Sequence, residues 1–224
     1  MSAQPLPVPQ TLDVLQTPHE ERLNTITHGA AATLSLIGLA LMLFTATTSG
    51  GTWAIVGATV FGVALVSLYL TSAIYHALPS GRAKELFRSF DHMGVYLLIA
   101  GTYTVICLTA LRESVGWGLF GAQWGMAAAG IALKSIYGPD RFEIVSTLGY
   151  VVMGWMVVPV FGEVMELFSV GAFSLLVAGG VCYTLGVPFF LLDQKKRFFH
   201  TIWHLFVMAG SVCHFLMAWL YLLD

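Results

Sequence analysis

The chain has 224 residues, of which 57% are hydrophobic and only 10% are charged, and its formal net charge is −2. Soluble domains carry about 25% charged residues, so this composition excludes an ordinary soluble domain and is typical of an integral membrane protein. The weakly negative charge gives no indication of nucleic-acid binding, and no nucleic-acid partner is predicted.

The chain begins with a short polar segment. Residues 1–20 are predicted to form a flexible N-terminal tail, because they are polar and contain four prolines. They lack the apolar core of a cleavable signal peptide. The remaining residues, 21–224, are predicted to form one all-α domain that spans the membrane.

Long apolar runs fill this domain. A helix needs about 20 apolar residues to cross the hydrocarbon core of a bilayer, and seven runs of about that length are separated by short charged clusters. A seven-transmembrane helix bundle is therefore predicted, with no room for a soluble catalytic domain. The predicted spans are residues 25–47, 52–75, 92–111, 115–134, 142–162, 167–191 and 200–222.

The distribution of basic residues predicts how the bundle is inserted. With seven spans, nine of the ten lysines and arginines fall on one side of the membrane, and only Arg112 falls on the other. Short loops rich in lysine and arginine face the cytoplasm in membrane proteins. The N-terminus is therefore predicted to be cytoplasmic, and the C-terminus to lie outside.

Four of the predicted spans carry polar or ionisable side chains at one depth, near the cytoplasmic face. Such groups are costly inside a membrane helix, so they are interpreted as a functional site. On the last span, His200 and His204 are four residues apart and share one face of the helix. His214 lies about 15 Å deeper and is predicted to be a buried hydrogen-bonding group. The rest of the layer is Glu21, Asn24 and His28 on the first span, Ser72 and His76 on the second, and Asp91 and His92 on the third.

Three histidines of this layer form a candidate zinc site. Catalytic zinc takes three protein ligands and keeps a fourth position for water, and His76, His200 and His204 supply three imidazoles. Zinc lowers the pKa of bound water to about 7, which makes a usable nucleophile. Asp91 is predicted to hold this water, either directly or through the residues that surround the ligands, and to act as the general base. Ser72 is predicted to orient water or a substrate carbonyl.

The other polar residues of the layer have open interpretations. His28 either packs against a neighbouring helix or supports the metal site. His92 points about 100° away from Asp91 around its helix, so it is predicted to face a neighbour or the membrane interface. Glu21 and Asn24 are predicted to anchor the first span at the interface, with a role in the site as the alternative.

The same residues resemble the motifs of a known family, the hemolysin III family. This family is the bacterial branch of the progestin and adiponectin receptor family, in a superfamily that includes alkaline ceramidases. The resemblance covers the chain from about residue 18 to the end. It rests on Glu21-x2-Asn24-x2-Thr27-His28, Ser72-x3-His76, Phe90-Asp91-His92 and His200-x3-His204, which occur in the family's order and on the matching spans.

The resemblance implies a seven-helix bundle in the bacterial inner (plasma) membrane, with the N-terminus inside. It also implies Zn2+ held by His76, His200 and His204, with Asp91 contacting the zinc through water. Relatives often have proline after the Gly-Thr-Tyr-Thr run of the third span, where this chain has Val105. A weaker kink is therefore predicted there.

Three functions are compatible with these features. The favoured one is a zinc-dependent hydrolase that acts on an amide or ester bond of a membrane lipid and takes part in membrane lipid homeostasis. The alternative is a non-catalytic membrane sensor or regulator in which zinc is structural. A pore-forming cytolysin, which the family name suggests, is the least favoured, because a secreted pore former needs a soluble state. Membrane lipids are the predicted partners.

Overall fold

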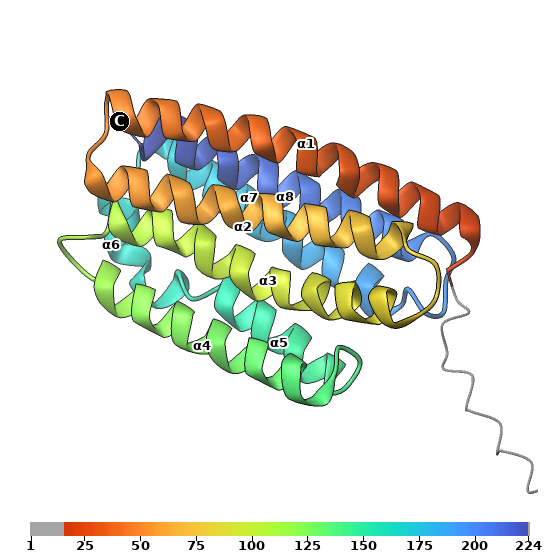
Figure 1. Ribbon diagram of the computed structural model, residues 1–224. Coiled ribbons are helices and arrows are strands. Elements are labelled where there is room, and N and C mark those ends of the chain that lie inside the picture. Colours follow the sequence, from red (N-terminus) through yellow and green to blue (C-terminus); the bar gives the residue numbers. More distant parts are fainter. Residues whose placement is uncertain (1–15, 224) are drawn as a thin grey trace, which may run out of the picture.

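The computed structural model describes residues 16–223, and all regular structure in that part of the chain is helical. Its long helices lie side by side along one axis and form a bundle (Figure 1). The all-α class predicted from the sequence is therefore confirmed. In chain order the elements are α1 (Pro18–Thr48), α2 (Thr52–Ala77), α3 (Arg82–Leu108), α4 (Gly116–Tyr137), α5 (Glu143–Gly154), the 3₁₀ helix η1 (Val158–Val160), α6 (Phe161–Leu167), α7 (Val170–Leu191) and α8 (Phe199–Tyr221).

Six helical segments within residues 16–223 are long and apolar enough to cross a membrane. Five of them are α1, α2, α3, α7 and α8, and the sixth is Glu143–Leu167, in which α5, η1 and α6 follow one another. α4 has 22 residues but is not among them, because its glycines and Gln123 lower its mean hydropathy. The protein is thus a multi-pass membrane protein, whereas the seventh span and the direction of insertion stay predictions.

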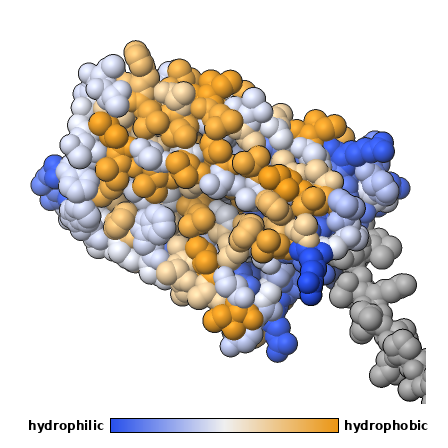
Figure 2. Space-filling model, viewed as in Figure 1, coloured by the Kyte–Doolittle hydropathy of each residue, from blue (hydrophilic) through white to orange (hydrophobic). Residues whose placement is uncertain are grey.

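The surface of the bundle has the polarity of a membrane protein. Large apolar side chains are exposed along α1, among them Ile26 (66%), Leu34 (62%) and Phe44 (69%). In Figure 2, apolar side chains cover much of the lateral surface over α1 and α2, and hydrophilic side chains gather at the two ends. Apolar faces of this extent are unusual on a soluble monomer, and lipid is the environment that accommodates them.

α1 begins at Pro18, earlier than residue 25, where the first span is predicted to start. A capping box starts the helix: the Thr17 hydroxyl accepts the Glu20 N–H (3.3 Å), and the Glu20 carboxylate accepts the Thr17 N–H (2.9 Å). The pair satisfies backbone donors that a helix N-terminus otherwise leaves free. Residues 18–20 of the predicted N-terminal tail are thus helical, and its residues 1–15 lie outside the described residues.

The Glu143–Leu167 segment is interrupted after Gly154, where a 3₁₀ turn containing Pro159 replaces the α-helix. Proline has no N–H for α-helical hydrogen bonding, and backbone groups freed inside a membrane need other partners. Tyr103 of α3 is such a partner. Its hydroxyl donates to the Gly154 carbonyl (2.8 Å) and accepts from the Val157 N–H (2.9 Å). The interrupted segment is thereby held against α3.

α2 and α3 pack closely because glycines lie at their contact. A Cβ added to Gly57 would lie 2.9 Å from the Cα of Val105. α3 continues as a helix through Val105 to Leu108, and the weaker kink predicted there stays a prediction. In contrast, a Cβ added to Gly125 of α4 would meet no atom within 4 Å.

The two glycines predict opposite effects of the same substitution. In Gly57→Ala the new methyl group meets backbone atoms of α3 that cannot move aside, so we expect a loss of about 1–2 kcal/mol in stability. Gly125→Ala should leave stability unchanged or raise it, because alanine is the better helix former. Thermal unfolding of both purified variants in one detergent measures this. Equal unfolding temperatures would contradict the close contact of α2 with α3.

Candidate metal centre

Three histidines meet at one end of the bundle. His76 lies in the last turn of α2, and His200 and His204 lie in the first two turns of α8. Each offers one ring nitrogen, and these nitrogens all lie within 4.8 Å of one another. His76 and His204 are buried, and His200 is half-buried. The structure therefore brings together the three histidines that the sequence predicts as metal ligands.

Two of these rings are oriented by carboxylates. The Nδ1 atom of His76 lies 2.6 Å from Oε2 of Glu21, and Nδ1 of His200 lies 2.7 Å from Oδ2 of Asp193. A carboxylate accepts the Nδ1 proton, so Nε2 carries the lone pair. Both Nε2 atoms are buried and have no hydrogen-bond partner among the described residues. Histidine held in this way is the usual form of a metal ligand in proteins.

The residues present therefore fit a divalent metal ion. The rings of His76 and His200, whose Nε2 atoms have no partner in the described part of the chain, lie 5.0 Å and 4.7 Å between centroids from the ring of His204. The Nδ1 of His204 lies 3.3 Å from the Thr27 hydroxyl. Three imidazoles suit zinc and several other divalent transition metals. The donor set accounts for two buried nitrogens that would otherwise be left without a partner.

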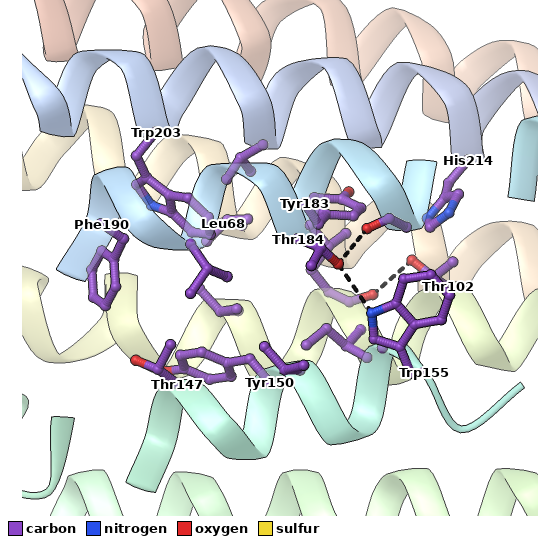
Figure 3. A pocket seen from close by; sticks show the side chains of 18 of the residues that line it. Leu68, Thr102, Thr147, Tyr150, Trp155, Tyr183, Thr184, Phe190, Trp203 and His214 are labelled. Carbon is purple, nitrogen blue, oxygen red and sulfur yellow. Dashed lines mark hydrogen bonds between the residues drawn. The ribbon is translucent and has the colours of Figure 1, made fainter. Parts of the chain in front are cut away.

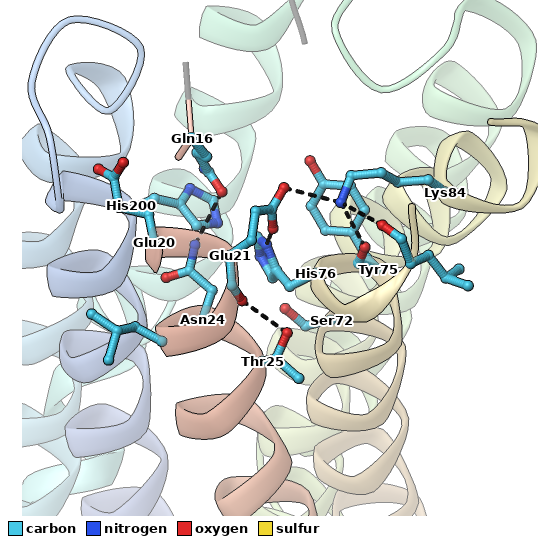
Figure 4. A network of polar contacts seen from close by, with 12 residues as sticks. Gln16, Glu20, Glu21, Asn24, Thr25, Ser72, Tyr75, His76, Lys84 and His200 are labelled. Carbon is cyan, nitrogen blue, oxygen red and sulfur yellow. Dashed lines mark hydrogen bonds and ion pairs between the residues drawn. The ribbon is translucent and has the colours of Figure 1, made fainter. Parts of the chain in front are cut away.

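A polar network around the centre connects α1 to both neighbouring helices (Figure 4). The second carboxylate oxygen of Glu21 pairs with Lys84 at 3.0 Å, and Lys84 also donates to the backbone carbonyls of Tyr75 (3.0 Å) and Leu78 (3.2 Å) at the end of α2. The side chain of Asn24, which is fully buried, accepts a hydrogen bond from Thr201 of α8 (2.6 Å). α1 is thus hydrogen-bonded to both helices that carry the candidate ligands, to α2 through Glu21 and to α8 through Asn24.

His28 lies directly behind the centre. Its ring stacks on that of His204, with centroids 3.4 Å apart, and its Nδ1 lies 2.7 Å from the Ser72 hydroxyl. Ser72 is fully buried and also lies close to Asp91. His28 contacts a candidate ligand without belonging to the three-histidine cluster. Its position therefore agrees with the interpretation that it supports the site.

Asp91 of α3 borders the same cavity as His200 and His204 but does not belong to the histidine cluster. The structure therefore places it beside the candidate ligands rather than among them, and its predicted part in catalysis stays a prediction. His92 also borders the cavity, and its ring contacts that of Phe190 (6.1 Å between centroids). Its neighbour is thus α7, in agreement with the interpretation that His92 faces another helix.

A cavity that His200 and His204 border lies inside the bundle, and Figure 3 shows some of the side chains that line it. It has a volume of about 140 Å³ and is enclosed by α3, α5, α7 and α8, with mainly apolar side chains on its walls. Asp91 and His200 border one end, and Ile106 and His214 border the other. Fourteen residues separate His200 from His214 along α8, which corresponds to about 20 Å.

Sequence reasoning misses two residues that the structure places around the centre. Asp193 follows α7 and returns to His200, but nothing in its spacing from that histidine shows that the α7–α8 loop folds back. Lys84 is interpreted from the sequence only as a topology signal. Glu21, in contrast, belongs to the motif stripe of the first span, and its role as a partner of His76 corresponds to the alternative left open for it.

Comparison with known proteins agrees with the motifs. The Haemolysin-III related family matches residues 16–215. The chain belongs to this family. Hemolysin-3 of Bacillus cereus is 42% identical over 204 residues, which cover 91% of this chain and 92% of that protein. The hemolysin-3 homolog of Bacillus subtilis (strain 168) is 38% identical over 202 residues, covering 90% and 94%.

A more distant relative is human. Monocyte to macrophage differentiation factor of Homo sapiens is 28% identical over 215 residues, which cover 92% of this chain and 86% of that protein. Each match spans most of the length of both chains, so the sequence similarity is not confined to an isolated motif.

Removing a ligand should abolish metal binding. The wild-type protein, purified in detergent, should carry roughly one metal ion per chain, because three histidines form one site. His76→Ala and His204→Ala should each lose the ion, which elemental analysis by mass spectrometry measures. His92→Ala, which removes a half-buried histidine outside the cluster, should retain it. Retention of the ion in His76→Ala would exclude this centre.

Removing a carboxylate partner should weaken metal binding without abolishing it. Asp193→Asn leaves the His200 ring in place but no longer accepts its Nδ1 proton as an anion, so metal affinity should fall about 10–100-fold. Competition with a fluorescent chelator measures the affinity. Asp140→Asn is the matched control, because Asp140 is exposed and pairs with Arg88. Equal affinities in the two variants would show that Asp193 does not support the centre.

Proposed function

We propose that this Haemolysin-III related protein is a metal-dependent hydrolase, with zinc as the metal, that cleaves an amide or ester bond of a membrane lipid. One observation supports it above all: the three-histidine centre borders a long apolar cavity, together with a carboxylate that is not needed as a ligand. A structural zinc site takes four protein ligands, whereas a catalytic site takes three and keeps a position for substrate. Only three converge among the described residues.

The chain's own residues divide the chemistry between them. His76, His200 and His204 would hold the zinc, which supplies Lewis-acid polarisation of a carbonyl and activation of water when it is bound. Asp91 accepts the proton of the attacking water and returns it to the leaving amine or alcohol, as a general base and then a general acid. Ser72 lies beside Asp91 and is itself fixed by a hydrogen bond with His28, so it can orient water or a substrate carbonyl.

The cavity supports a lipid as the substrate class. Its walls are mainly apolar, so an acyl chain placed there exchanges water or lipid contacts for side-chain contacts at little cost. The reacting bond would then lie at the polar end, next to Asp91 and His200. We infer further that this end faces the cytoplasm in a bacterial inner (plasma) membrane, because the loops beside it carry most of the basic residues.

Turnover and its dependence on Asp91 test this function. Protein reconstituted in vesicles should hydrolyse a ceramide or a phospholipid, and mass spectrometry should detect the free fatty acid. Asp91→Asn should lower the rate at least 100-fold while retaining the metal, because it removes only proton transfer. Asp140→Asn should retain the wild-type rate. A metal-loaded protein that shows no turnover on either lipid, or an Asp91→Asn variant with full activity, would contradict the proposal.

A second candidate is a sensor or regulator in which the metal is structural. The observation that favours it is the position of the centre between α2 and α8, with α1 attached to both through Glu21 and Asn24. Removing the metal should then lower the unfolding temperature sharply. Asp91→Ala should leave membrane lipid composition intact in cells, whereas the hydrolase hypothesis predicts a change.

A further inference from the structure

The end of the cavity far from the metal centre contains a second histidine with an unpartnered nitrogen. His214 of α8 is only 8% exposed and borders the cavity, ten residues beyond His204 (Figure 3). Ten residues of helix correspond to about 15 Å. The Nδ1 atom of His214 is buried and has no hydrogen-bond partner among residues 16–223. His214 therefore marks a place in the cavity distinct from the metal centre.

The surroundings of His214 determine what its free nitrogen can bind. Nε2 lies 3.1 Å from the backbone carbonyl of Leu176, and a carbonyl can only accept a hydrogen bond. Nε2 therefore carries the proton, and Nδ1 is an acceptor. A Cβ added to Gly179 would lie 2.3 Å from both Cδ2 and Nε2, so this edge of the ring packs against α7. Nδ1 lies on the opposite side of the ring.

The polar side chains nearby already have other partners. The Tyr183 hydroxyl forms a hydrogen bond with Ser211 (2.8 Å), and the Trp155 indole N–H donates to Thr184 (3.0 Å). Thr184 in turn donates to the carbonyl of Gly180 (2.7 Å). None of these side chains reaches Nδ1 of His214. A buried acceptor is rarely left without a donor in proteins, so the donor is expected to come from the occupant of the cavity.

We propose that His214 binds a hydroxyl group carried on the lipid chain that fills the cavity. The identity of the occupant as a lipid rests on the proposed function, and this inference adds that the chain is hydroxylated. A hydroxyl donates one hydrogen bond and brings no charge into apolar walls, whereas an ammonium group would lose its hydration there. A carboxyl carbon level with His204, the candidate ligand nearer to His214 along α8, would place a hydroxyl level with His214 about twelve carbons along an extended chain, over the rise of about 15 Å.

Binding of three matched fatty acids tests the proposal without requiring catalysis. Octadecanoic acid, 12-hydroxyoctadecanoic acid and 2-hydroxyoctadecanoic acid would be titrated into detergent-purified protein, with the fluorescence of Trp155 and Trp203, which border the cavity, as the signal. The wild type should bind the 12-hydroxy acid about tenfold more tightly than octadecanoic acid, as one added hydrogen bond to a buried acceptor predicts. His214→Leu should lose this preference. Any effect of the 2-hydroxyl should be the same in both proteins.

Equal binding of octadecanoic acid and its 12-hydroxy derivative by the wild type would overturn the proposal and leave water as the partner of His214. So would a preference that persists in His214→Leu. Where that variant does not fold, moving the hydroxyl along the chain decides: a maximum near carbon 12 supports the proposal, and a flat profile overturns it. A hydroxyl preference without turnover would contradict only the hydrolase, and turnover without the preference would contradict only the hydroxyl site.

Discussion

The hydrogen bond between a carboxylate and the imidazole of a candidate metal ligand is the interaction on which the rest of this structure depends. A polar side chain with little access to water needs a partner within the protein. Glu21 provides one for His76, and Asp193 provides one for His200. Each pairing fixes the ring and leaves its second nitrogen free. Because a free ring nitrogen can bind a metal ion, the two histidines and their neighbour His204 form a candidate metal centre.

The same requirement explains how the helices around the centre are arranged. α1 brings Glu21, Asn24 and His28 to one face, and each contacts a different polar group on α2 or α8. On the far side of the bundle, Tyr103 satisfies the two peptide groups released where the Glu143–Leu167 segment is interrupted. A cavity lined mainly by α3, α5, α7 and α8 lies beside this centre. The fold therefore joins a polar centre to an apolar space.

Much of this could be predicted from the sequence because its signals are local. Apolar runs of about 20 residues identify six of the membrane segments, and the spacing of His200 and His204 places both on one face of α8. Positive charges and polar residues at matching depths bring His76 to the same layer. The fourth predicted span, α4, is not among the helices apolar enough to cross a membrane, because its glycines and Gln123 lower its mean hydropathy. The start of α1 could have been read from the capping box Thr17-x-x-Glu20.

The remaining features depend on contacts between distant segments. No periodicity in the sequence shows that the loop after α7 brings Asp193 back to His200. Nor does it show that Lys84 of α3 pairs with Glu21 of α1. The cavity is also invisible in the sequence, because its lining residues come from several helices and are individually ordinary apolar side chains. His214 shows the difference clearly. Its burial follows from the sequence, but the orientation of its free nitrogen depends on the Leu176 carbonyl and on Gly179 of another helix.

We expect three histidines of this chain to hold one metal ion, and zinc K-edge X-ray absorption of the detergent-purified protein can show this, because the spectrum reports the ligand atoms and their distances. Three imidazole nitrogens are expected at about 2.0–2.1 Å from the zinc, from His76, His200 and His204. A protein that binds no zinc, or a zinc ion without imidazole ligands, would contradict this expectation.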